Sequence, residues 1–140
     1  LIIDKGAKDG VRREMAVIFN NNLVGKINGI SSSYSQVMLV VNEQFSILGK
    51  SGGGSVPGVI KGQGEFILFD KVAVNENITK GDALLTKGAI NEQGYGIPPG
   101  LIIGKILSVN KNENLPFQTA EAKSMVQYPK LETVFIVLGI

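Results

Sequence analysis

Short apolar runs separated by turn-forming residues occupy the chain from end to end. The runs are rich in Val, Ile and Phe, and Gly, Asn, Asp and Pro separate them, which is typical of short antiparallel β-strands. The apolar spacing of an amphipathic helix is hard to find. We therefore predict strands at residues 1–3, 15–20, 23–30, 35–41, 45–48, 56–61, 65–69, 83–86, 101–109, 117–123 and 133–138.

One pattern occurs twice. Met-Ala-Val-Ile-Phe at 15–19 and Leu-Val-Gly-Lys-Ile at 23–27 are followed later by Asp-Ala-Leu-Leu-Thr at 82–86 and Ile-Ile-Gly-Lys-Ile at 102–106. This doubling predicts two similar β units side by side. A glycine inside a strand marks a bend or a close approach of backbones. We therefore expect structural roles for Gly25 and Gly104, and outward-pointing side chains for Lys26 and Lys105, with partner binding as the alternative for the two lysines.

The strand count favours two barrels. Each half has about five predicted strands with short turns, and closing such a sheet removes exposed strand edges. We predict an all-β fold of two small packed β-barrel domains of antiparallel strands, at residues 1–72 and 73–140. Strand exchange between the two domains is the alternative.

Three segments between the predicted strands are typical of turns or loops. Asn21-Asn22 is a hairpin candidate, because Asn tolerates the positive φ of tight turns. Pro98, Pro99 and Gly100 should set the start of the long strand that follows, since proline fixes φ and glycine permits the turn. The loop Ser51-Gly52-Gly53-Gly54-Ser55 favours no single conformation; it is either a native hairpin tip or an engineered splice.

Composition removes the commonest catalytic groups. The 140 residues include no His and no Cys, so Ser-His-Asp and Cys-His catalysis cannot be assembled. Acidic residues are scattered singly, and we expect no metal site and no cofactor. The net charge is +2 with no basic stripe, so we expect no nucleic-acid binding.

One enzymatic alternative stays open. Ser108 and Lys111 fit a Ser-x-x-Lys string, in which a helix start brings the lysine amine over the serine hydroxyl. Here the string runs off a predicted strand into an Asn-rich turn. A Ser-Lys hydrolase on a β-rich fold is therefore the second hypothesis, behind a non-enzymatic role.

The apolar runs are far shorter than the roughly twenty residues that a membrane helix needs. The chain begins with Leu-Ile-Ile, in the middle of a predicted strand. We therefore expect that an upstream portion has been removed, and that any membrane attachment is through an N-terminal anchor absent from this chain.

An ordered set of short strings resembles the extracytoplasmic β region of the MreC family of bacterial rod-shape determinants. They are Ile3-Asp4-Lys5-Gly6, Lys8-Asp9-Gly10-Val11, Met15-Ala16-Val17, Leu23-Val24-Gly25-Lys26-Ile27, Gly62-Gln63-Gly64, Ile78-Thr79-Lys80-Gly81-Asp82, Thr86-Lys87-Gly88, Ile97-Pro98-Pro99-Gly100-Leu101, Gly104-Lys105-Ile106 and Leu131-Glu132-Thr133-Val134. The resemblance covers essentially the whole chain. It implies two β-barrel domains, preceded in the longer protein by a membrane helix and a coiled coil.

The resemblance also implies a function. It points to a non-catalytic scaffold of the cell-wall elongation machinery, involved in cell shape through protein contacts and self-association. The implied partners are the elongation transpeptidase, which is a penicillin-binding protein, and MreD. The implied location is the extracytoplasmic face of the bacterial plasma membrane, in the periplasm or its equivalent.

Aromatic residues near turns are the candidate partner-binding residues, because aromatic anchors dominate protein interfaces. They are Phe19, Tyr34, Phe45 and Tyr95. Burial in the core is the alternative, and it is favoured for Phe45. An exposed strand edge offers a second route, by which one copy could pair with another.

Overall fold

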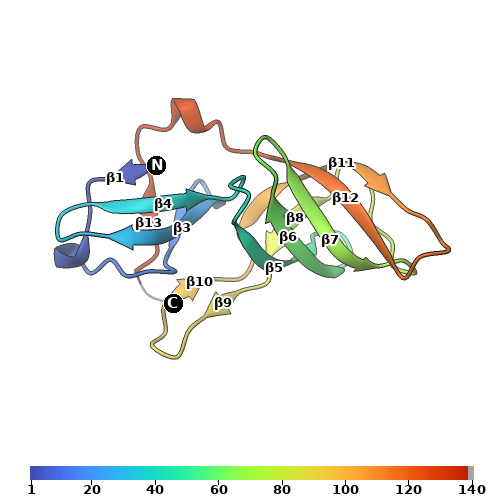
Figure 1. The fold of residues 1–140 in the computed structure, drawn as a ribbon, viewed down its shortest axis with the longest axis horizontal. Helices are drawn as coiled ribbons and strands as arrows, with labels where there is room; N and C mark the ends of the chain where they lie inside the picture. Colours follow the sequence, from blue (N-terminus) through green and yellow to red (C-terminus); the bar gives the residue numbers. More distant parts are fainter. Residues whose placement is uncertain (139–140) are drawn as a thin grey trace.

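The computed structural model describes residues 1–138 and confirms the all-β prediction (Figure 1). Two single-turn 3-10 helices, η1 (Ala7–Asp9) and η2 (Tyr128–Lys130), are the helical segments of this part of the chain. The strands are β1 (Ile2–Ile3), β2 (Ala16–Phe19), β3 (Asn22–Ile30), β4 (Ser35–Leu39), β5 (Ser46–Ser51), β6 (Pro57–Gly62), β7 (Ile67–Ala73), β8 (Ala83–Thr86), β9 (Ala89–Ile90), β10 (Gly96–Ile97), β11 (Ile102–Asn110), β12 (Phe117–Ser124) and β13 (Phe135–Ile136).

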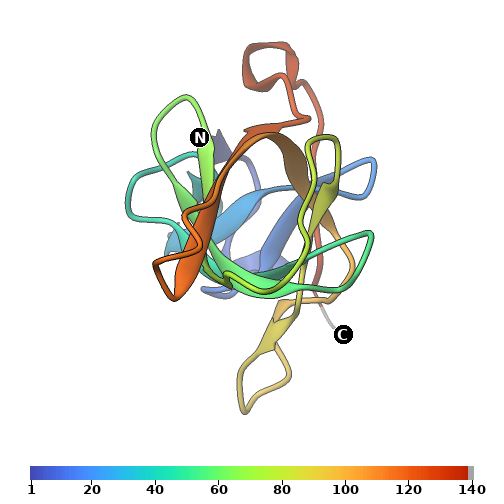
Figure 2. The ribbon, with the colours of Figure 1, turned by 90° about the vertical axis from the view of Figure 1, so that its right-hand side faces the viewer.

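Six strands form a closed barrel, seen end-on in Figure 2. The order around the ring is β11, β12, β7, β6, β5 and β8, which pairs with β11 again, and every neighbouring pair is antiparallel. Ring closure leaves no free strand edge in this unit. We call these six strands the barrel.

Five further strands form an antiparallel sheet, in the order β1, β4, β3, β2 and β13. We call it the first sheet. Its last strand, β13, comes from the opposite end of the chain. A single parallel pairing, between Asn22 of β3 and Ile102 of β11, joins the first sheet to the barrel.

The sequence repeat is a structural repeat. The antiparallel meander β2-β3-β4 has the same register as the meander β8-β11-β12. In both, the Gly-Lys pair of the middle strand faces an apolar pair: Gly25 is opposite Val17 and Lys26 opposite Ala16, while Gly104 is opposite Leu84 and Lys105 opposite Ala83. Both middle strands then carry a β-bulge toward the third strand, between Ile27 and Gly29 in one and between Ile106 and Ser108 in the other.

The two glycines of this motif lie against backbone of the third strand. A Cβ on Gly25 would lie 2.1 Å from the Met38 carbonyl oxygen, and one on Gly104 would lie 2.6 Å from that of Lys123. Neither distance is compatible with a side chain unless backbone moves. Close backbone approach is therefore the physical reason for glycine at both positions.

The turns that precede the two meanders also match. The N–H of Glu14 donates to the Ile27 carbonyl at 2.9 Å, and the N–H of Gly81 donates to the Ile106 carbonyl at 2.8 Å. Both residues have positive φ, +73° for Glu14 and +96° for Gly81. The repeat thus extends beyond the strings that are recognisable in the sequence.

Strand pairing crosses the predicted boundary between residues 72 and 73. Barrel strands β5, β6 and β7 begin before it, whereas β8, β11 and β12 follow it, and β7 itself spans it. The boundary therefore coincides with no break in hydrogen bonding. Whether residues 1–72 and 73–140 behave as separate domains stays a prediction.

The predicted Asn hairpin is shifted by one residue. Asn20 and Asn21 carry the positive φ values, +49° and +63°, so they form the turn, and Asn22 begins β3. The Asn22 side-chain amide donates to the carbonyls of Phe19 and Asn20 at 3.2 and 3.0 Å. This side-chain bonding holds the turn one position earlier than the sequence suggested.

The Gly-rich loop joins β5 to β6 as a hairpin tip. Gly52, Gly53 and Gly54 are exposed. Ser51, which ends β5, is fully buried, and its hydroxyl accepts a hydrogen bond from the Val56 N–H at 3.2 Å. The serine at the base therefore fixes the hairpin. The Gly52 N–H also donates to the Ala83 carbonyl at 2.7 Å, which continues the contact between β5 and β8.

The loop between β8 and β11 contains the Pro-Pro-Gly segment. Buried Thr86 donates from Oγ1 to the Pro98 carbonyl at 2.7 Å and accepts from the Leu101 N–H at 2.9 Å. Gly100 has φ +85°, which favours glycine. Together these features fix the start of β11. The same loop carries the unpredicted β9-β10 hairpin, which projects from the molecule in Figure 1.

Two groups of buried apolar residues form the core. The larger fills the barrel and continues under the first sheet; it contains Phe69, Ile60, Ile103 and Phe45. The smaller lies on the other face of the first sheet around Met15, Val17, Val24 and Ile27. Because Tyr128 packs against both groups, the segment after β12 links the two units.

Candidate protein-binding surfaces

The predicted aromatic anchors do not form one cluster. Phe19 is 37% exposed beside the β2-β3 turn, and Tyr34 is 54% exposed beside the β3-β4 turn. These turns lie at opposite ends of β3, a strand of nine residues, which spans about 30 Å. A small interface can therefore use one of these side chains but not both.

Phe45 and Tyr95 have other surroundings. Phe45 is 1% exposed, so its prediction as a partner-binding residue is corrected: the side chain is needed in the core, where the Lys26 ammonium lies 5.9 Å from the ring centroid. Tyr95, on the β9-β10 hairpin, packs partly against the smaller core group. It ties the hairpin to the first sheet.

Two neighbouring hollows lie where the segment after β12 crosses from the barrel to the first sheet. One holds about 400 Å³ and the other about 320 Å³, and they share Val126, Gln127 and Lys130. We call their combined lining the junction surface. Its residues are Phe19, Asn20, Asn22, Val41, Gly64, Glu65, Lys123, Ser124, Met125, Val126, Gln127, Tyr128, Pro129, Lys130 and Leu131.

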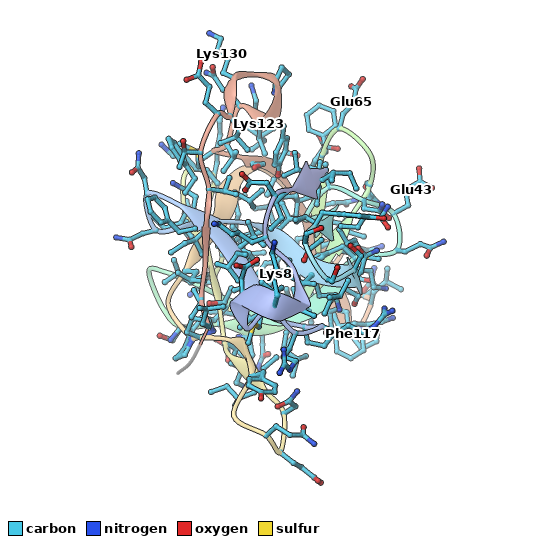
Figure 3. The ribbon with its side chains drawn as sticks, turned by 90° about the vertical axis from the view of Figure 1, so that its left-hand side faces the viewer. Lys8, Glu43, Glu65, Phe117, Lys123 and Lys130 are labelled. Atoms are coloured by element: carbon cyan, nitrogen blue, oxygen red, sulfur yellow. The ribbon has the colours of Figure 1, made fainter. Side chains whose placement is uncertain are left out.

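The junction surface combines apolar contact with charge. Lys123, Lys130 and Glu65 lie along one side of the molecule in Figure 3. The hydroxyls of Tyr128 and Ser124 are 3.0 Å apart. Burial raises the pKa of the Tyr128 hydroxyl, and its hydrogen bond with Ser124 opposes part of that rise. Tyr128 therefore stays a neutral hydrogen-bonding group on this surface.

Met125 is the most exposed apolar residue of this surface, and the sequence analysis did not name it as a candidate. Its side chain is 55% exposed and lines the same hollow as Phe19. Methionine adapts its shape to a partner and is frequent at binding surfaces. The signal in the sequence is an apolar residue directly after a strand, in a stretch that leads to Pro129.

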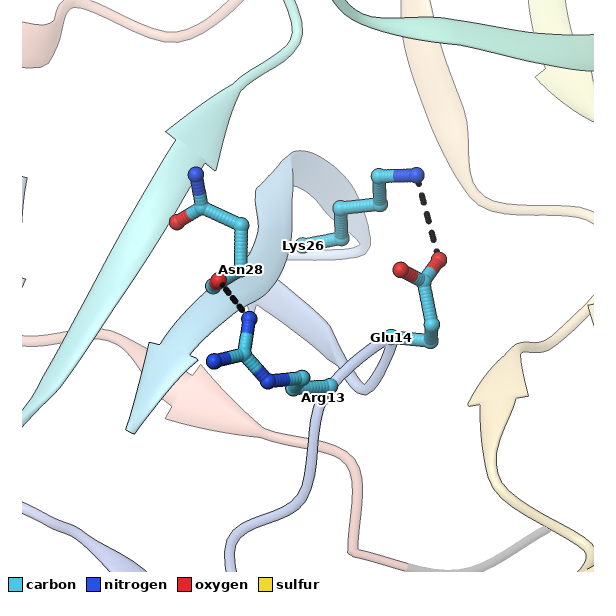
Figure 4. Close-up of polar contacts among 4 residues, drawn as sticks. All are labelled: Arg13, Glu14, Lys26 and Asn28. Carbon is cyan, nitrogen blue, oxygen red and sulfur yellow. Dashed lines mark hydrogen bonds and ion pairs between the residues drawn. The ribbon is translucent and has the colours of Figure 1, made fainter. Parts of the chain in front are cut away.

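The repeated lysines differ between the two meanders. Lys26 is 3.1 Å from a Glu14 carboxylate oxygen (Figure 4), with its side chain only 21% exposed. Beside it, the Arg13 guanidinium donates to the Asn28 carbonyl. Lys105 is exposed on the outer wall of the barrel. Lys26 is thus engaged within the first sheet, whereas Lys105 faces solvent.

The arrangement gives no support to hydrolase chemistry. Ser108 lies in strand β11 and Lys111 just beyond its end, so no helical turn brings the lysine amine over the serine hydroxyl as the Ser-x-x-Lys string requires. Within residues 1–138 no hydrogen bond joins their side chains, and no group of three acidic residues is placed to hold a metal ion.

Among the described residues, no helix has the length and apolar character to cross a membrane.

The fold defines the class: an all-β protein in which a closed six-stranded barrel carries a second, open antiparallel sheet. The chain belongs to the MreC family, because the family described as "Rod shape-determining protein MreC, barrel core" matches residues 1–138. This is a family of structural cell-shape determinants, not of enzymes.

Named relatives and solved structures agree with this membership. Cell shape-determining protein MreC of Haemophilus influenzae is 25% identical over 97% of this chain, and that of Escherichia coli is 21% identical over 99%. The chain spans only 38% and 37% of their lengths.

The fold is shared with known MreC structures. That of Pseudomonas aeruginosa MreC covers 97% of this chain and 86% of its own, at TM-score 0.86 and 24% identity. The structure of Listeria MreC covers 96% of this chain and 65% of its own chain, at TM-score 0.83 and 26% sequence identity. A third similar chain comes from a complex between penicillin-binding protein PBP2 and MreC of Helicobacter pylori. It covers 86% of this chain and 74% of its own chain, at TM-score 0.67 and 19% sequence identity.

Proposed function

We propose that this chain is a scaffold module of the bacterial cell-wall elongation machinery, which holds other proteins in place by contact. The observation that carries the proposal is the family match over residues 1–138, since the family is one of rod shape determinants. The module works on the extracytoplasmic face of the plasma membrane. A similar chain described as the major periplasmic domain of the cell shape-determining filament MreC supports this location.

The partner we propose is the outer portion of the elongation transpeptidase. The complex of PBP2 with MreC from Helicobacter pylori supports this choice. MreD and a second copy of the chain are further proposed partners, which rest on the family resemblance.

The junction surface is the proposed contact. It offers two hollows side by side, two exposed apolar side chains in Phe19 and Met125, and lysines at its rim. Apolar anchors inside a polar rim are the arrangement of protein interfaces. Tyr34 is the alternative anchor, at the far end of β3.

A binding measurement with matched variants tests the site. The test variant combines Phe19→Ser and Met125→Ser, which lie 37% and 55% exposed; the control combines Leu107→Ser and Leu48→Ser, on the barrel wall at the same 37% and 55%. Because the fractional exposures match, both variants replace two comparably exposed apolar side chains, and the main difference between the variants is their position.

We expect the test variant to bind the transpeptidase's outer domain at least about tenfold more weakly than the control in titration calorimetry. Equal affinity of test, control and unaltered chain would remove the junction surface from the proposal. A Tyr34→Ser variant that loses binding instead would move the contact to the other end of β3. Failure of the unaltered chain to bind would remove the transpeptidase as a partner of this module.

A further inference from the structure

A small hollow lies on the outer wall of the barrel, across strands β5, β6 and β7 and the end of β8. It holds about 200 Å³, which is below the roughly 300–1,000 Å³ of small-molecule pockets and suits a single inserted side chain. We call it the barrel hollow. Its lining consists of Leu48, Pro57, Gly58, Val59, Lys71 and Lys87, and it shares no residue with the junction surface.

The apolar part of the barrel hollow is built from paired strands. Leu48 of β5 lies opposite Val59 of β6, and the first side chain is 55% exposed whereas the second is half-buried. Between Pro57 and Val59, a Cβ on Gly58 would lie 2.5 Å from the Phe69 ring of the core. The floor of the hollow therefore rests directly on the core, and its walls offer apolar contact.

A β-bulge places Lys71 at this hollow. The register of β7 with β12 shifts between Gln118 and Ala120. Two residues of β7, Asp70 and Lys71, occupy the shift, and bulges of this kind change the direction of a side chain. Lys71 has φ +58°, a left-handed conformation that a non-glycine residue adopts only at a cost in backbone strain. The fold thus holds a lysine in a strained conformation at the edge of the hollow.

Both lysines of the lining are positioned by contacts within the chain. The Lys71 ammonium lies 5.7 Å from the centroid of the Phe117 ring, a cation–π geometry. The Lys87 N–H donates to the Leu48 carbonyl at 3.2 Å, which fixes the start of the loop after β8 beside β5. Both side chains are exposed. These contacts reduce the ordering that a partner must impose when it binds.

The charge around the barrel hollow is unbalanced. The carboxylate of Asp70 is engaged by the Lys61 ammonium at 3.2 Å and by the Lys71 N–H at 2.8 Å. Within residues 1–138, the side chains of Lys71 and Lys87 form no ion pair. Lys50, on the outer face of β5, adds a further positive charge. The mouth of the hollow therefore presents ammonium groups that lack carboxylate partners.

We propose that the barrel hollow binds an acidic segment of a partner protein, in which one apolar side chain lies between carboxylates. The apolar side chain enters between Leu48 and Val59, and the carboxylates pair with the ammonium groups of Lys71 and Lys87. Charge complementarity selects this occupant, because an acidic segment supplies the charges that the lysines lack. The concave shape favours a peptide over a lipid surface. This contact is additional to the one proposed for the transpeptidase.

Fluorescence anisotropy with the whole chain tests the assignment. The probe is a labelled pentapeptide with a leucine between two pairs of glutamates, and the comparison peptide has serine in place of the leucine. The test variant combines Lys71→Gln and Lys87→Gln. The control combines Lys80→Gln and Lys105→Gln, exposed lysines near the other end of β8. Both variants therefore lose two positive charges, and the two variants differ in where they lose them.

We expect the test variant to bind the leucine peptide at least about tenfold more weakly than the control. We expect the unaltered chain to bind the serine peptide about fivefold more weakly than the leucine peptide. Equal affinity of the two variants would show diffuse charge attraction and overturn the proposal. Equal affinity for the two peptides, or no binding of the leucine peptide by the unaltered chain, would also overturn it.

Further measurements on the same test variant separate other occupants. Binding to phosphatidylglycerol vesicles without binding to the peptide would assign the hollow to a membrane. Self-association in sedimentation that the test variant alone loses would assign it to a second copy. Loss of transpeptidase binding would make the hollow part of the contact proposed above. Each of these results would overturn the proposal.

The strained position of Lys71 calls for a second variant. Unfolding curves show whether the test and control variants are folded. If Lys71→Gln prevents folding, Lys87→Gln alone is measured, and we expect it to weaken binding of the leucine peptide about threefold. Unchanged affinity of this single variant would then count against the proposal in the same way.

Discussion

The two meanders, β2-β3-β4 and β8-β11-β12, have the same register, the same bulge position and the same hydrogen-bonded turn before them. Their surroundings differ. The second meander is closed into a ring by β5, β6 and β7, whereas the first is flanked only by β1 and β13. Local residues therefore fix the meander, and strands from elsewhere in the chain decide whether it closes.

The connections inside the two meanders also differ. Asn20 and Asn21 suffice between β2 and β3, while residues 87–101 separate β8 from β11. The longer connection adds contacts that the first meander lacks, including the Thr86 hydrogen bonds and the packing of Tyr95 against the first sheet. One β unit thus accepts very different loops without losing its register.

The largest expected effect concerns the two motif glycines. Because a Cβ would meet backbone in both meanders, at 2.1 Å for Gly25 and 2.6 Å for Gly104, we expect Gly25→Ala to lower the free energy of unfolding by about 3 kcal/mol and Gly104→Ala by about 2 kcal/mol. Urea denaturation measures both. Gly53→Ala in the exposed hairpin tip, where the nearest contact is 3.5 Å, is the control. A harmless Gly25→Ala would contradict the shared close approach.

The next effect belongs to the second meander alone. Thr86→Val leaves the Pro98 carbonyl and the Leu101 N–H without their hydroxyl partner at a fully buried position. We expect a loss of about 2 kcal/mol in the free energy of unfolding and faster hydrogen exchange at Leu101. Thr86→Ser keeps the hydroxyl and should cost clearly less; equal losses for Ser and Val would assign the effect to packing instead.

We expect substitutions in the two matched turns, at Gly81 and Glu14, to change the free energy of unfolding by different amounts. Gly81 has φ +96° with open space around a Cβ, so Gly81→Ala is expected to cost about 1 kcal/mol through backbone strain alone. Glu14→Gly relieves the strain at φ +73° but removes the ion pair with Lys26. We expect its net change to stay within about 0.5 kcal/mol. Thermal unfolding of both variants checks the difference, and a reversed ranking would refute it.

The smallest expected effect is a pH dependence on the barrel wall, where β6 has no counterpart in the first sheet. Partial burial alone raises the pKa of Asp70, but the Lys71 N–H and the Lys61 ammonium, 3.2 Å away, outweigh it and hold that pKa below its usual value. The carboxylate therefore stabilises the fold above its unfolded pKa of about 4, and this contribution disappears as the pH falls through the folded pKa.

For Asp70→Asn we accordingly expect a loss below about 1 kcal/mol at neutral pH that shrinks toward zero in acid. Unfolding curves between pH 7 and about pH 2 give the comparison. A loss that is the same at every pH would show that the substitution acts by some route other than charge.

Local patterns in the sequence are enough to predict many of the strands. The predicted strand at 83–86 coincides with β8 (Ala83–Thr86), and the one at 23–30 differs from β3 (Asn22–Ile30) by one residue. Alternation of apolar residues and nearby turn formers is enough for such strands. The doubled Gly-Lys motif also marks the two matching meanders, because both glycines lie close to the backbone of the third strand.

Local patterns could not predict which strands pair with one another or which side chains meet on the surface. Nothing local distinguishes β5 as a neighbour of β8, or β13 as a neighbour of β2, because pairing is decided by the whole set of strands. Phe45 was named as a candidate anchor with burial as the favoured alternative, and it is 1% exposed with the Lys26 ammonium 5.9 Å from its ring centroid. Met125 lies in the junction surface because the segment after β12 returns to the β2-β3 turn, where both Met125 and Phe19 line one hollow. This long-range contact has no local signal in the sequence.

The pairing of β13 with β2 makes the first sheet depend on both ends of the described chain. Phe135 lies opposite Ile18, so the first sheet has all five of its strands only when both segments are present. The six barrel strands lie within residues 46–124. Removal of β13 therefore leaves every barrel pairing in place and takes an edge strand from the first sheet alone.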